Sequence, residues 1–558
     1  MVSKAFFKTL LLFFFRLLLK HFRNPKSLHR SFSNSNYHLH ASSLFKFQRF
    51  PPPPHSSQTI LSNLSTTTTT TLIFSVEGSL LKSSSLFPYF MLVAFEAGSL
   101  FRAILLFVLY PFVCLLSHET GLKIMVMVCF LGIKKDKFRV GTSVLPKFFL
   151  EDVGLESFEL LTGAAAHGNK LVGVSDLPRV MVECFLRDYL KIECVVARDL
   201  KVFCGYFLGV MEEERNTTTV DQITSSNVIG ITSSTKPLDH HLFSHCKEIY
   251  LVNEADRRSW HNLPRDRYPE PLIFHDGRLA LRPTPLAIVA MFMWIPFGLT
   301  LAIIRTVVGL SLPYNCLIPI LVFSGLRLKV VTKSNHNMII KEDSKAKAKA
   351  KGLLYVSNHR TLLDPLYLSF GLKKPLSAVT YSLSRLSEIL APIRTVRLTR
   401  DRVEDSKIME KLLDEGDMII FPEGTTCREP HLLRFSPLFS EMSVDIVPVA
   451  MDTCVSMFYG TTASGFKCLD PLFFLMNPSP TYTIHFLDKI ITPPRRSSSS
   501  SSQNNSRFEV ANYIQTQLAM ALGFQCTTLT RTDKYLILAG NEGVVLASTS
   551  TSTPTNFK

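Results

Sequence analysis

Two long stretches near the middle of this 558-residue chain contain no charged residue. Pro285 to Ile304 extends for twenty residues, Thr306 to Leu326 extends for twenty-one, and Arg305 alone separates them. A helix of about 20 apolar residues crosses a hydrocarbon core about 30 Å thick, so each stretch is long enough to cross it. Two buried core helices are the alternative, but uncharged runs of this length favour a transmembrane hairpin within residues 276–330.

Basic residues flank the predicted hairpin on both sides. Arg278 and Arg282 precede it, and Arg327 and Lys329 follow it. Because loops rich in Lys and Arg stay on the cytosolic side, both ends of the hairpin are expected in the cytosol. The sequence therefore predicts a multi-pass integral membrane protein whose C-terminal domain, residues 331–546, faces the cytosol.

The formal net charge of +16 is concentrated near the N-terminus. Residues 1–76 contain nine Lys or Arg and no Asp or Glu, and the rest of the chain has no zinc-finger, RRM or KH signature. We therefore expect membrane lipid, and no nucleic acid, as a partner. Residues 1–70 are predicted to be a basic membrane or targeting segment with a linker. A signal-anchor for the endoplasmic reticulum and a mitochondrial import sequence both fit this segment.

The region between this segment and the hairpin has a different pattern. Residues 71–275 alternate apolar strands with helical segments, which indicates an α/β domain with a parallel sheet. The run from Ala103 to Ser117 interrupts the domain and is short for a membrane crossing, so we expect an interfacial or re-entrant hydrophobic element there. The tail, residues 547–558, is rich in Ser and Thr and is predicted to be disordered.

The eleven cysteines are scattered along the chain and form no C-x-x-C pair. Their odd number fits no closed disulfide framework. We predict a reduced chain with no metal site and no bound cofactor. An isolated cysteine such as Cys427 is then a packing residue.

The C-terminal domain contains a histidine and a carboxylate at a loop-to-helix junction. In "LLYVSNHRTLLDPLYLSF" an apolar strand leads through His359 to Asp364, and Pro365 suits the first turn of a helix. A carboxylate that binds one imidazole nitrogen fixes the tautomer whose other nitrogen can take a proton from an alcohol. The same carboxylate stabilises the imidazolium that results. His-x4-Asp alone is a weak pattern, because a single histidine is more often structural.

Three later segments add weight to this pair. "APIRTVRLTRDRVED" clusters arginines, including Arg397 and Arg400, and guanidinium groups suit bidentate binding of phosphate. "MIIFPEGTTCREP" runs from an apolar strand into a turn at Glu423 and Gly424. "DIVPVAM" is a further strand-like segment and contains Pro448.

In order and spacing these segments resemble the four blocks of the glycerolipid acyltransferase superfamily. The blocks are Asn-His-x4-Asp from Asn358, the arginine-rich segment ending near Arg400, Phe-Pro-Glu-Gly and Val-Pro-Val. The phrases "YSLSRLSEILAPIRTVRLTRDR", "EGTTCREPHLLRFSPLF" and "FYGTTASGFKCLDPLFF" narrow the resemblance to plant glycerol-3-phosphate acyltransferases of the cutin and suberin type. The resemblance covers most of residues 71–545.

The resemblance implies acyl transfer from acyl-CoA to a hydroxyl of sn-glycerol 3-phosphate. His359 would act as the general base, and Asp364 would orient it and balance its charge. The set of implied substrate-binding residues is larger. Arg400, assisted by Arg397, would bind the substrate phosphate, Glu423 and Gly424 would shape the glycerol phosphate pocket, Pro448 would lie nearer the acyl-CoA, and Asn358 completes the set.

In this family the N-terminal region resembles a haloacid-dehalogenase-type phosphatase, which requires an Asp nucleophile and further carboxylates for Mg²⁺. Here Ser75 replaces the nucleophile and Glu77 replaces the second Asp, while Ser175 is still suited to bind phosphate. Asp239 is retained, but an acidic partner expected near Thr235 is missing. We therefore predict a degenerate domain without phosphatase activity, so that the product remains lysophosphatidic acid.

Three alternatives remain open beside this prediction. A bifunctional acyltransferase and phosphatase would release monoacylglycerol, but Ser75 argues against it. A lysophosphatidate-type acyltransferase would share the His-x4-Asp chemistry. A non-catalytic membrane scaffold with a basic N-terminus is the most remote.

Overall fold

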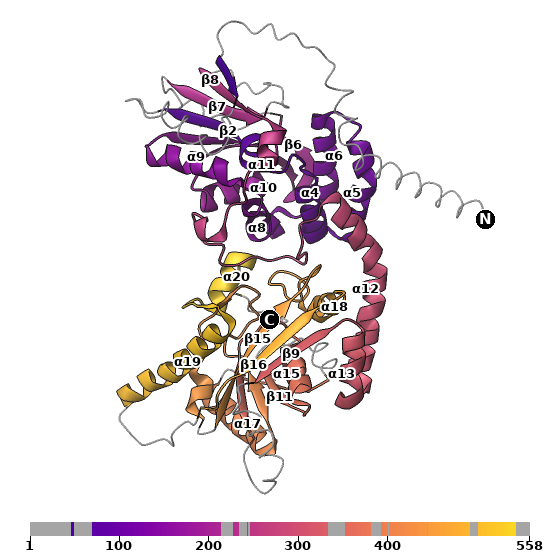
Figure 1. Cartoon of the computed structure of the whole chain (residues 1–558), viewed down its shortest axis with the longest axis vertical. Coiled ribbons are helices and arrows are strands. Elements are labelled where there is room, and N and C mark those ends of the chain that lie inside the picture. Colours follow the sequence, from indigo (N-terminus) through magenta and orange to yellow (C-terminus); the bar gives the residue numbers. More distant parts are fainter. Residues whose placement is uncertain are drawn as a thin grey trace, which may run out of the picture. The chain divides into compact units, whose positions relative to one another are not determined.

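The structure, a computed structural model, divides the chain into two compact units (Figure 1). The first contains Met1–Leu272 and Arg282–Ile288, and the second contains Ile273–Leu281 and Val289–Lys558. Most of the N-terminal segment, the tail, Thr235, Asp239 and Arg400 lie outside the described residues, so the predictions for them stay predictions. The structure describes residues 46–49, 70–213, 227–233, 243, 246–332, 352–380, 392–399, 401–442, 445–490 and 500–542.

A six-stranded parallel sheet forms the first unit, with the strand order β1-β8-β7-β2-β3-β4. Strand β2 (Thr71–Ser75) is the fully buried run TLIFS, as expected for a parallel sheet covered on both faces. This confirms the predicted α/β architecture. The other strands are β1 (Lys46–Arg49), β3 (Lys170–Val174), β4 (Cys194–Val196), β7 (Val228–Ser233) and β8 (Glu248–Val252). The main helices are α4 (Phe87–Val93), α5 (Leu100–Val113), α6 (His118–Phe130), α8 (Leu145–Leu150), α9 (Leu155–Ala166), α10 (Arg179–Cys184) and α11 (Glu254–Ser259).

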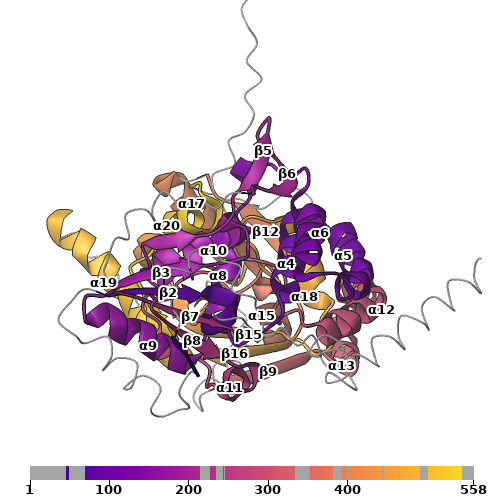
Figure 2. The same ribbon diagram turned by 90° about the horizontal axis from the view of Figure 1, so that it is seen from above.

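The hydrophobic run predicted at Ala103 to Ser117 belongs largely to helix α5. Its fourteen residues make a helix about 21 Å long at 1.5 Å per residue. Phe101 is 72% exposed and Phe112 is 54% exposed. The hairpin of β5 (Leu200–Phe203) and β6 (Tyr206–Met211), which projects from this unit in Figure 2, also exposes apolar side chains such as Phe203.

Helix α12 (Pro285–Ser311) contains the first of the two uncharged stretches. It has 27 residues, and among the described residues it is the one helix that is long and apolar enough to cross a membrane. The second stretch differs from our prediction. Helix α13 (Tyr314–Phe323) has ten residues, about 15 Å of helix, which is half of the hydrocarbon thickness. Pro313 lies between the two helices as the N-cap of α13, and its missing N–H favours a break in the helical hydrogen bonding there.

Arg305, which separates the two uncharged stretches in the sequence, lies inside α12, where it is buried. Its guanidinium donates to the backbone oxygens of Leu475 at 2.6 Å and Asn477 at 2.7 Å. It also donates to the hydroxyl of Ser324 at 2.9 Å. Because its donors are satisfied by carbonyl groups of the second unit, the charge does not end the helix.

A seven-stranded sheet forms the second unit, with the order β12-β11-β13-β10-β15-β16-β9. Neighbouring strands are parallel except β15 and β16, which are antiparallel. Two buried apolar clusters pack against the sheet. The strands are β9 (Arg327–Thr332), β10 (Leu354–Ser357), β11 (Ser377–Thr380), β12 (Arg394–Arg397), β13 (Met418–Ile420), β15 (Ile446–Cys454) and β16 (Thr481–Phe486). The helices include α15 (Asp364–Leu372), α17 (Arg402–Glu415), α18 (Asp470–Leu475), α19 (Ser500–Leu522) and α20 (Arg531–Ala539).

Strand β9 begins at Arg327, inside the range predicted as hairpin, and pairs with β16 along its whole length. The sheet therefore begins before residue 331. Strand β10 lies in the middle of the sheet between β13 and β15. In open α/β sheets, ligands bind beyond the carboxyl ends of the strands, and the carboxyl end of β10 leads into His359.

Candidate active site

His359 and Asp364 are in direct contact. The Nδ1 atom of His359 lies 2.8 Å from Oδ2 of Asp364. Asp364 is fully buried and begins α15, while the His359 side chain is 14% exposed. The short loop after β10 is therefore sufficient to bring the two groups together, and the Nε2 atom of His359 is left as the nitrogen for a reacting group.

Asp364 also accepts hydrogen bonds from four donors other than the imidazole. The backbone N–H groups of Arg360 and Thr361 lie at 2.5 Å and 3.0 Å, and the Thr361 hydroxyl lies at 3.1 Å. The fourth donor is the hydroxyl of Tyr482, on β16. Burial and the nearby Asp364 carboxylate raise the pKa of Tyr482 well above its usual value, so its hydroxyl keeps the proton that it donates. Sequence reasoning missed Tyr482, because it lies 118 residues from Asp364.

Glu423 lies behind the histidine loop. It is buried, and its carboxylate accepts from the backbone N–H of His359 at 2.8 Å and of Leu433 at 3.1 Å. Burial raises the pKa of Glu423 from 4.5 to about 7. Glu423 is not among the residues that line the cavity described below. In the structure it supports the main chain at His359.

Asn358 and Pro448 are likewise framework residues in this structure. The side chain of Asn358 makes two hydrogen bonds with the backbone of Met451, at 2.9 Å and 2.8 Å, which tie β10 to β15. Pro448 lies within β15 opposite Val356. Arg397 is exposed at the end of β12, opposite Thr380 of β11. Of the predicted residues with described positions, Gly424 joins His359 at the cavity wall.

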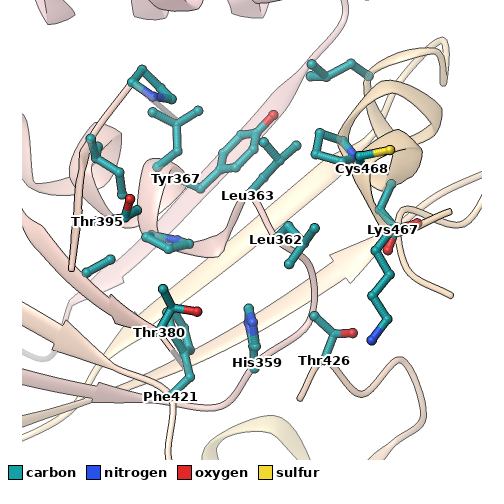
Figure 3. A pocket seen from close by; sticks show the side chains of 18 of the residues that line it. His359, Leu362, Leu363, Tyr367, Thr380, Thr395, Phe421, Thr426, Lys467 and Cys468 are labelled. Carbon is teal, nitrogen blue, oxygen red and sulfur yellow. The ribbon is translucent and has the colours of Figure 1, made fainter. Parts of the chain in front are cut away.

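A cavity of about 470 Å³ lies beside His359, within the second unit. Its wall near α12, α15 and α18 is mainly apolar, and Gly309, Leu310, Leu366, Phe370 and Leu475 contribute to it. Figure 3 shows His359 between Thr380 and Phe421 on one side and Thr426 and Lys467 on the other. A substrate that reacts at Nε2 of His359 can therefore contact both the apolar wall and the polar residues of the same cavity. Polar and charged residues at the other end are Gly424, Thr425, Thr426, Lys467, Arg531 and Tyr535.

One group of side chains in the described residues has the composition of a metal site. The ligand atoms of Cys427, Glu429 and His431 lie within 4.8 Å of one another, and all three residues are buried. The Cys427 thiol donates to Oε2 of Glu429 at 3.2 Å. Burial, together with Glu429 and Glu423, raises the pKa of this thiol well above its usual value. A protonated thiol is a poor ligand, so the group fits an internal hydrogen-bond network better than a metal.

In the first unit, a carboxylate fills the place expected for phosphate. The Ser175 hydroxyl donates to Oε1 of Glu77 at 2.5 Å. The backbone N–H groups of Asp176 and Leu177 donate to the same oxygen at 3.1 Å and 3.3 Å. A hydroxyl and two successive N–H groups form an anion-binding site, and here the anion is the chain's own Glu77.

Comparisons with known proteins agree with the two units. The profile of the HAD-like domain of RAM2-like glycerol-3-phosphate acyltransferases matches residues 71–252, and an acyltransferase profile matches residues 337–452. The chain is 58% identical to probable glycerol-3-phosphate acyltransferase 2 of Arabidopsis thaliana, over 85% of this chain and 90% of that protein. It is 54% identical to probable glycerol-3-phosphate acyltransferase 3 of the same plant, over 97% and 98%. It is 40% identical to glycerol-3-phosphate acyltransferase RAM2 of Petunia hybrida, over 84% and 97%.

Proposed function

The chain belongs to the plant glycerol-3-phosphate acyltransferases, and from this premise we propose how its C-terminal domain performs the reaction. It transfers a fatty acyl group from acyl-CoA to a hydroxyl of sn-glycerol 3-phosphate and gives lysophosphatidic acid. The observation that carries the proposal is the contact of His359 with Asp364 at the wall of a cavity that is apolar on one side and polar on the other.

His359 acts as the general base in this proposal. Its Nδ1–H donates to Asp364, so Nε2 accepts the proton of the glycerol 3-phosphate hydroxyl. The hydroxyl oxygen forms a bond to the thioester carbonyl carbon. When the tetrahedral intermediate collapses, the carbon–sulfur bond breaks and the imidazolium returns the proton to the CoA thiolate. Asp364 stabilises the imidazolium between these steps.

The substrates occupy different parts of the cavity. The acyl chain takes the apolar wall at α12, α15 and α18, because burying methylene groups there removes them from water. Thr380 and Thr395 line the side of the cavity next to β12, the strand that ends at Arg397. Arg400 lies outside the described residues. We assign these arginines to the phosphate of glycerol 3-phosphate, with Gly424 at the pocket. Three of the predicted residues act indirectly in this proposal, by holding the main chain around the site in position: Asn358, Glu423 and Pro448. No metal or bound cofactor takes part.

Helix α12 supplies the membrane anchor of the proposed enzyme. One face of it, with Thr306, Gly309 and Leu310, lines the cavity, while Phe297 is 68% exposed on the helix surface. An acyl-CoA in the bilayer surface would meet the cavity at this helix. We further propose a multi-pass protein of the endoplasmic reticulum or the mitochondrion whose acyltransferase domain faces the cytosol.

Membranes that contain wild type, His359→Ala or Asp364→Ala at equal protein levels test the proposal. They are incubated with labelled glycerol 3-phosphate and acyl-CoA, and lysophosphatidate is separated from monoacylglycerol. We expect lysophosphatidate from wild type and at least a hundredfold loss in both variants. His167→Ala, at an exposed histidine of the first unit, is the control and should retain activity. Equal activity in all four proteins would refute the assignment.

A further inference from the structure

Part of the polar end of the cavity is built by residues that follow the segment matched by the acyltransferase profile, which ends at residue 452. Lys467 precedes α18, and Arg531 and Tyr535 belong to α20. All three line the cavity that contains His359. Cationic side chains from outside the matched segment therefore line the cavity that contains His359.

Lys467 has a neutral partner. Its ammonium donates a hydrogen bond to the Tyr535 hydroxyl and lies 4.4 Å from the centre of the Tyr535 ring. Among the described residues, no carboxylate forms an ion pair with it. Figure 3 shows the ammonium directed toward Thr426, on the side of the cavity opposite Thr380. The positive charge of Lys467 is therefore available to an anion.

Arg531 brings a second cation to the same end. Its guanidinium lies 5.4 Å from the centre of the Tyr535 ring. A Cβ atom at Gly424, whose φ is +66°, would lie 3.9 Å from the Cδ atom of Arg531. The turn after β13 and the first residue of α20 therefore approach each other at the cavity wall.

The pKa of Tyr535 agrees with a positive electrostatic potential at the polar end of the cavity. Burial raises the pKa of Tyr535, but the charge and hydrogen bond of Lys467, with contributions from Thr425 and Lys534, lower it below its usual value. Lys534 is buried and donates to the backbone oxygen of Thr426. The nearby Asp533 accepts hydrogen bonds from Thr530 at the start of α20.

We propose that Lys467 and Arg531 form a phosphate-binding subsite that holds the phosphate groups of the CoA portion of the acyl donor. The inference rests on the proposed acyl transfer. Two phosphorylated substrates must meet at His359, and the proposed function assigns Arg397 and Arg400 to the phosphate of glycerol 3-phosphate, which leaves Lys467 and Arg531 for the phosphates of the other substrate. In this proposal the acyl chain lies along α12 and the phosphates lie at Lys467 and Arg531, and the pantetheine arm between them carries the thioester past His359. Guanidinium and ammonium groups are the usual phosphate ligands of proteins.

The test is a steady-state comparison of full-length wild type with Lys467→Gln and Arg531→Gln in membranes. We expect KM for palmitoyl-CoA to rise about tenfold in each variant, because a charge-assisted hydrogen bond is lost. The KM for glycerol 3-phosphate and kcat should change less than about threefold. Inhibition by free CoA, which has the phosphates but no acyl chain, should weaken by the same factor. Arg531→Lys should retain part of the affinity.

Lys411→Gln, at an exposed position of α17, is the matched charge control and should behave as wild type. A rise in KM for glycerol 3-phosphate alone would overturn the assignment to CoA. Unchanged KM values for both substrates would overturn the subsite, as would loss of kcat at saturating substrates. Thermal unfolding identifies any variant that fails to fold. In that case the KM of Arg531→Lys for palmitoyl-CoA decides whether the subsite exists. If wild type itself makes no lysophosphatidate, the proposed function fails before this inference is tested.

Discussion

At the residue scale, Asp364 shows which parts of the site can be predicted from sequence. His359 and Asp364 lie five residues apart, so a loop and one helical turn bring them together, and the pattern predicts their contact. Tyr482 reaches the same carboxylate from a strand 118 residues away. No local pattern reports such a contact, because it depends on the antiparallel pairing of β15 with β16. For the same reason, no local sequence pattern predicts that Lys467 and Arg531 lie at the cavity that contains His359.

Tyr482→Phe should lower kcat about tenfold and change KM little. The substitution removes one buried donor to Asp364, and a hydrogen bond to a charged group contributes about 1.5 to 3 kcal/mol. Asp364 would then hold His359 less well. Activity assays on membranes at equal protein levels check this. Tyr513→Phe, at an exposed tyrosine of α19, is the control. A Tyr482→Phe enzyme with unchanged kcat would show that the hydroxyl does not position the pair.

Glu423 gives a pH-dependent prediction. Burial raises its pKa from 4.5 to about 7 in the folded protein, so between these values the folded state holds a proton that the unfolded chain has released. The protein therefore loses stability as pH rises through this window. Glu423→Gln cannot ionise and should not show that loss. We expect the Tm of Glu423→Gln minus that of wild type to increase from pH 5 to pH 8.

Thermal unfolding in detergent at four pH values provides the measurement for Glu423. Glu410→Gln, at an exposed position of α17, should show a Tm difference from wild type that does not depend on pH. A Glu423→Gln difference that is equally flat would mean that Glu423 is ionised in the folded protein throughout this range.

At the scale of elements, the sequence predicts the parallel sheets better than the membrane helices. A buried parallel strand is a short apolar run, and TLIFS at β2 shows it directly. Arg305 separates the two uncharged stretches in the sequence, but α12 continues through it. The reason lies in the carbonyl groups near residues 475–478, which are distant in sequence and accept its hydrogen bonds.

Arg305→Leu should destabilise the second unit by about 3 kcal/mol or more. The substitution leaves the buried oxygens of Leu475 and Asn477 without their donors, and each unsatisfied buried group costs about 1 to 3 kcal/mol. The apolar side chain would nevertheless suit a membrane helix, so hydropathy alone predicts the opposite result. The Tm of the detergent-solubilised protein separates the two views. Val307→Leu, at an exposed position two residues away, should leave Tm unchanged.

At the scale of the whole molecule, the two α/β units of the chain use charged groups in different ways. In the second unit the ionisable residues surround a cavity. In the first, Ser75 stands at the end of β2, and Glu77 binds the hydroxyl of Ser175 and two backbone N–H groups. The sequence predicts the loss of the nucleophile. It does not predict that Glu77 would occupy the anion site, because that depends on where β3 ends relative to β2.

Restoring the nucleophile should therefore not restore a phosphatase. In Ser75→Asp the carboxylate of Glu77 still accepts the hydrogen bonds of the Ser175 hydroxyl and the Asp176 N–H, which would otherwise bind a phosphate. Its negative charge also repels a phosphate group. We expect lysophosphatidate as the product of both wild type and Ser75→Asp, assayed with Mg²⁺ present and monoacylglycerol quantified separately. The double variant Ser75→Asp/Glu77→Asp shortens the side chain that fills the site and is the informative comparison. Monoacylglycerol from the single variant would show that a phosphate displaces Glu77 and that the missing nucleophile alone silences this unit.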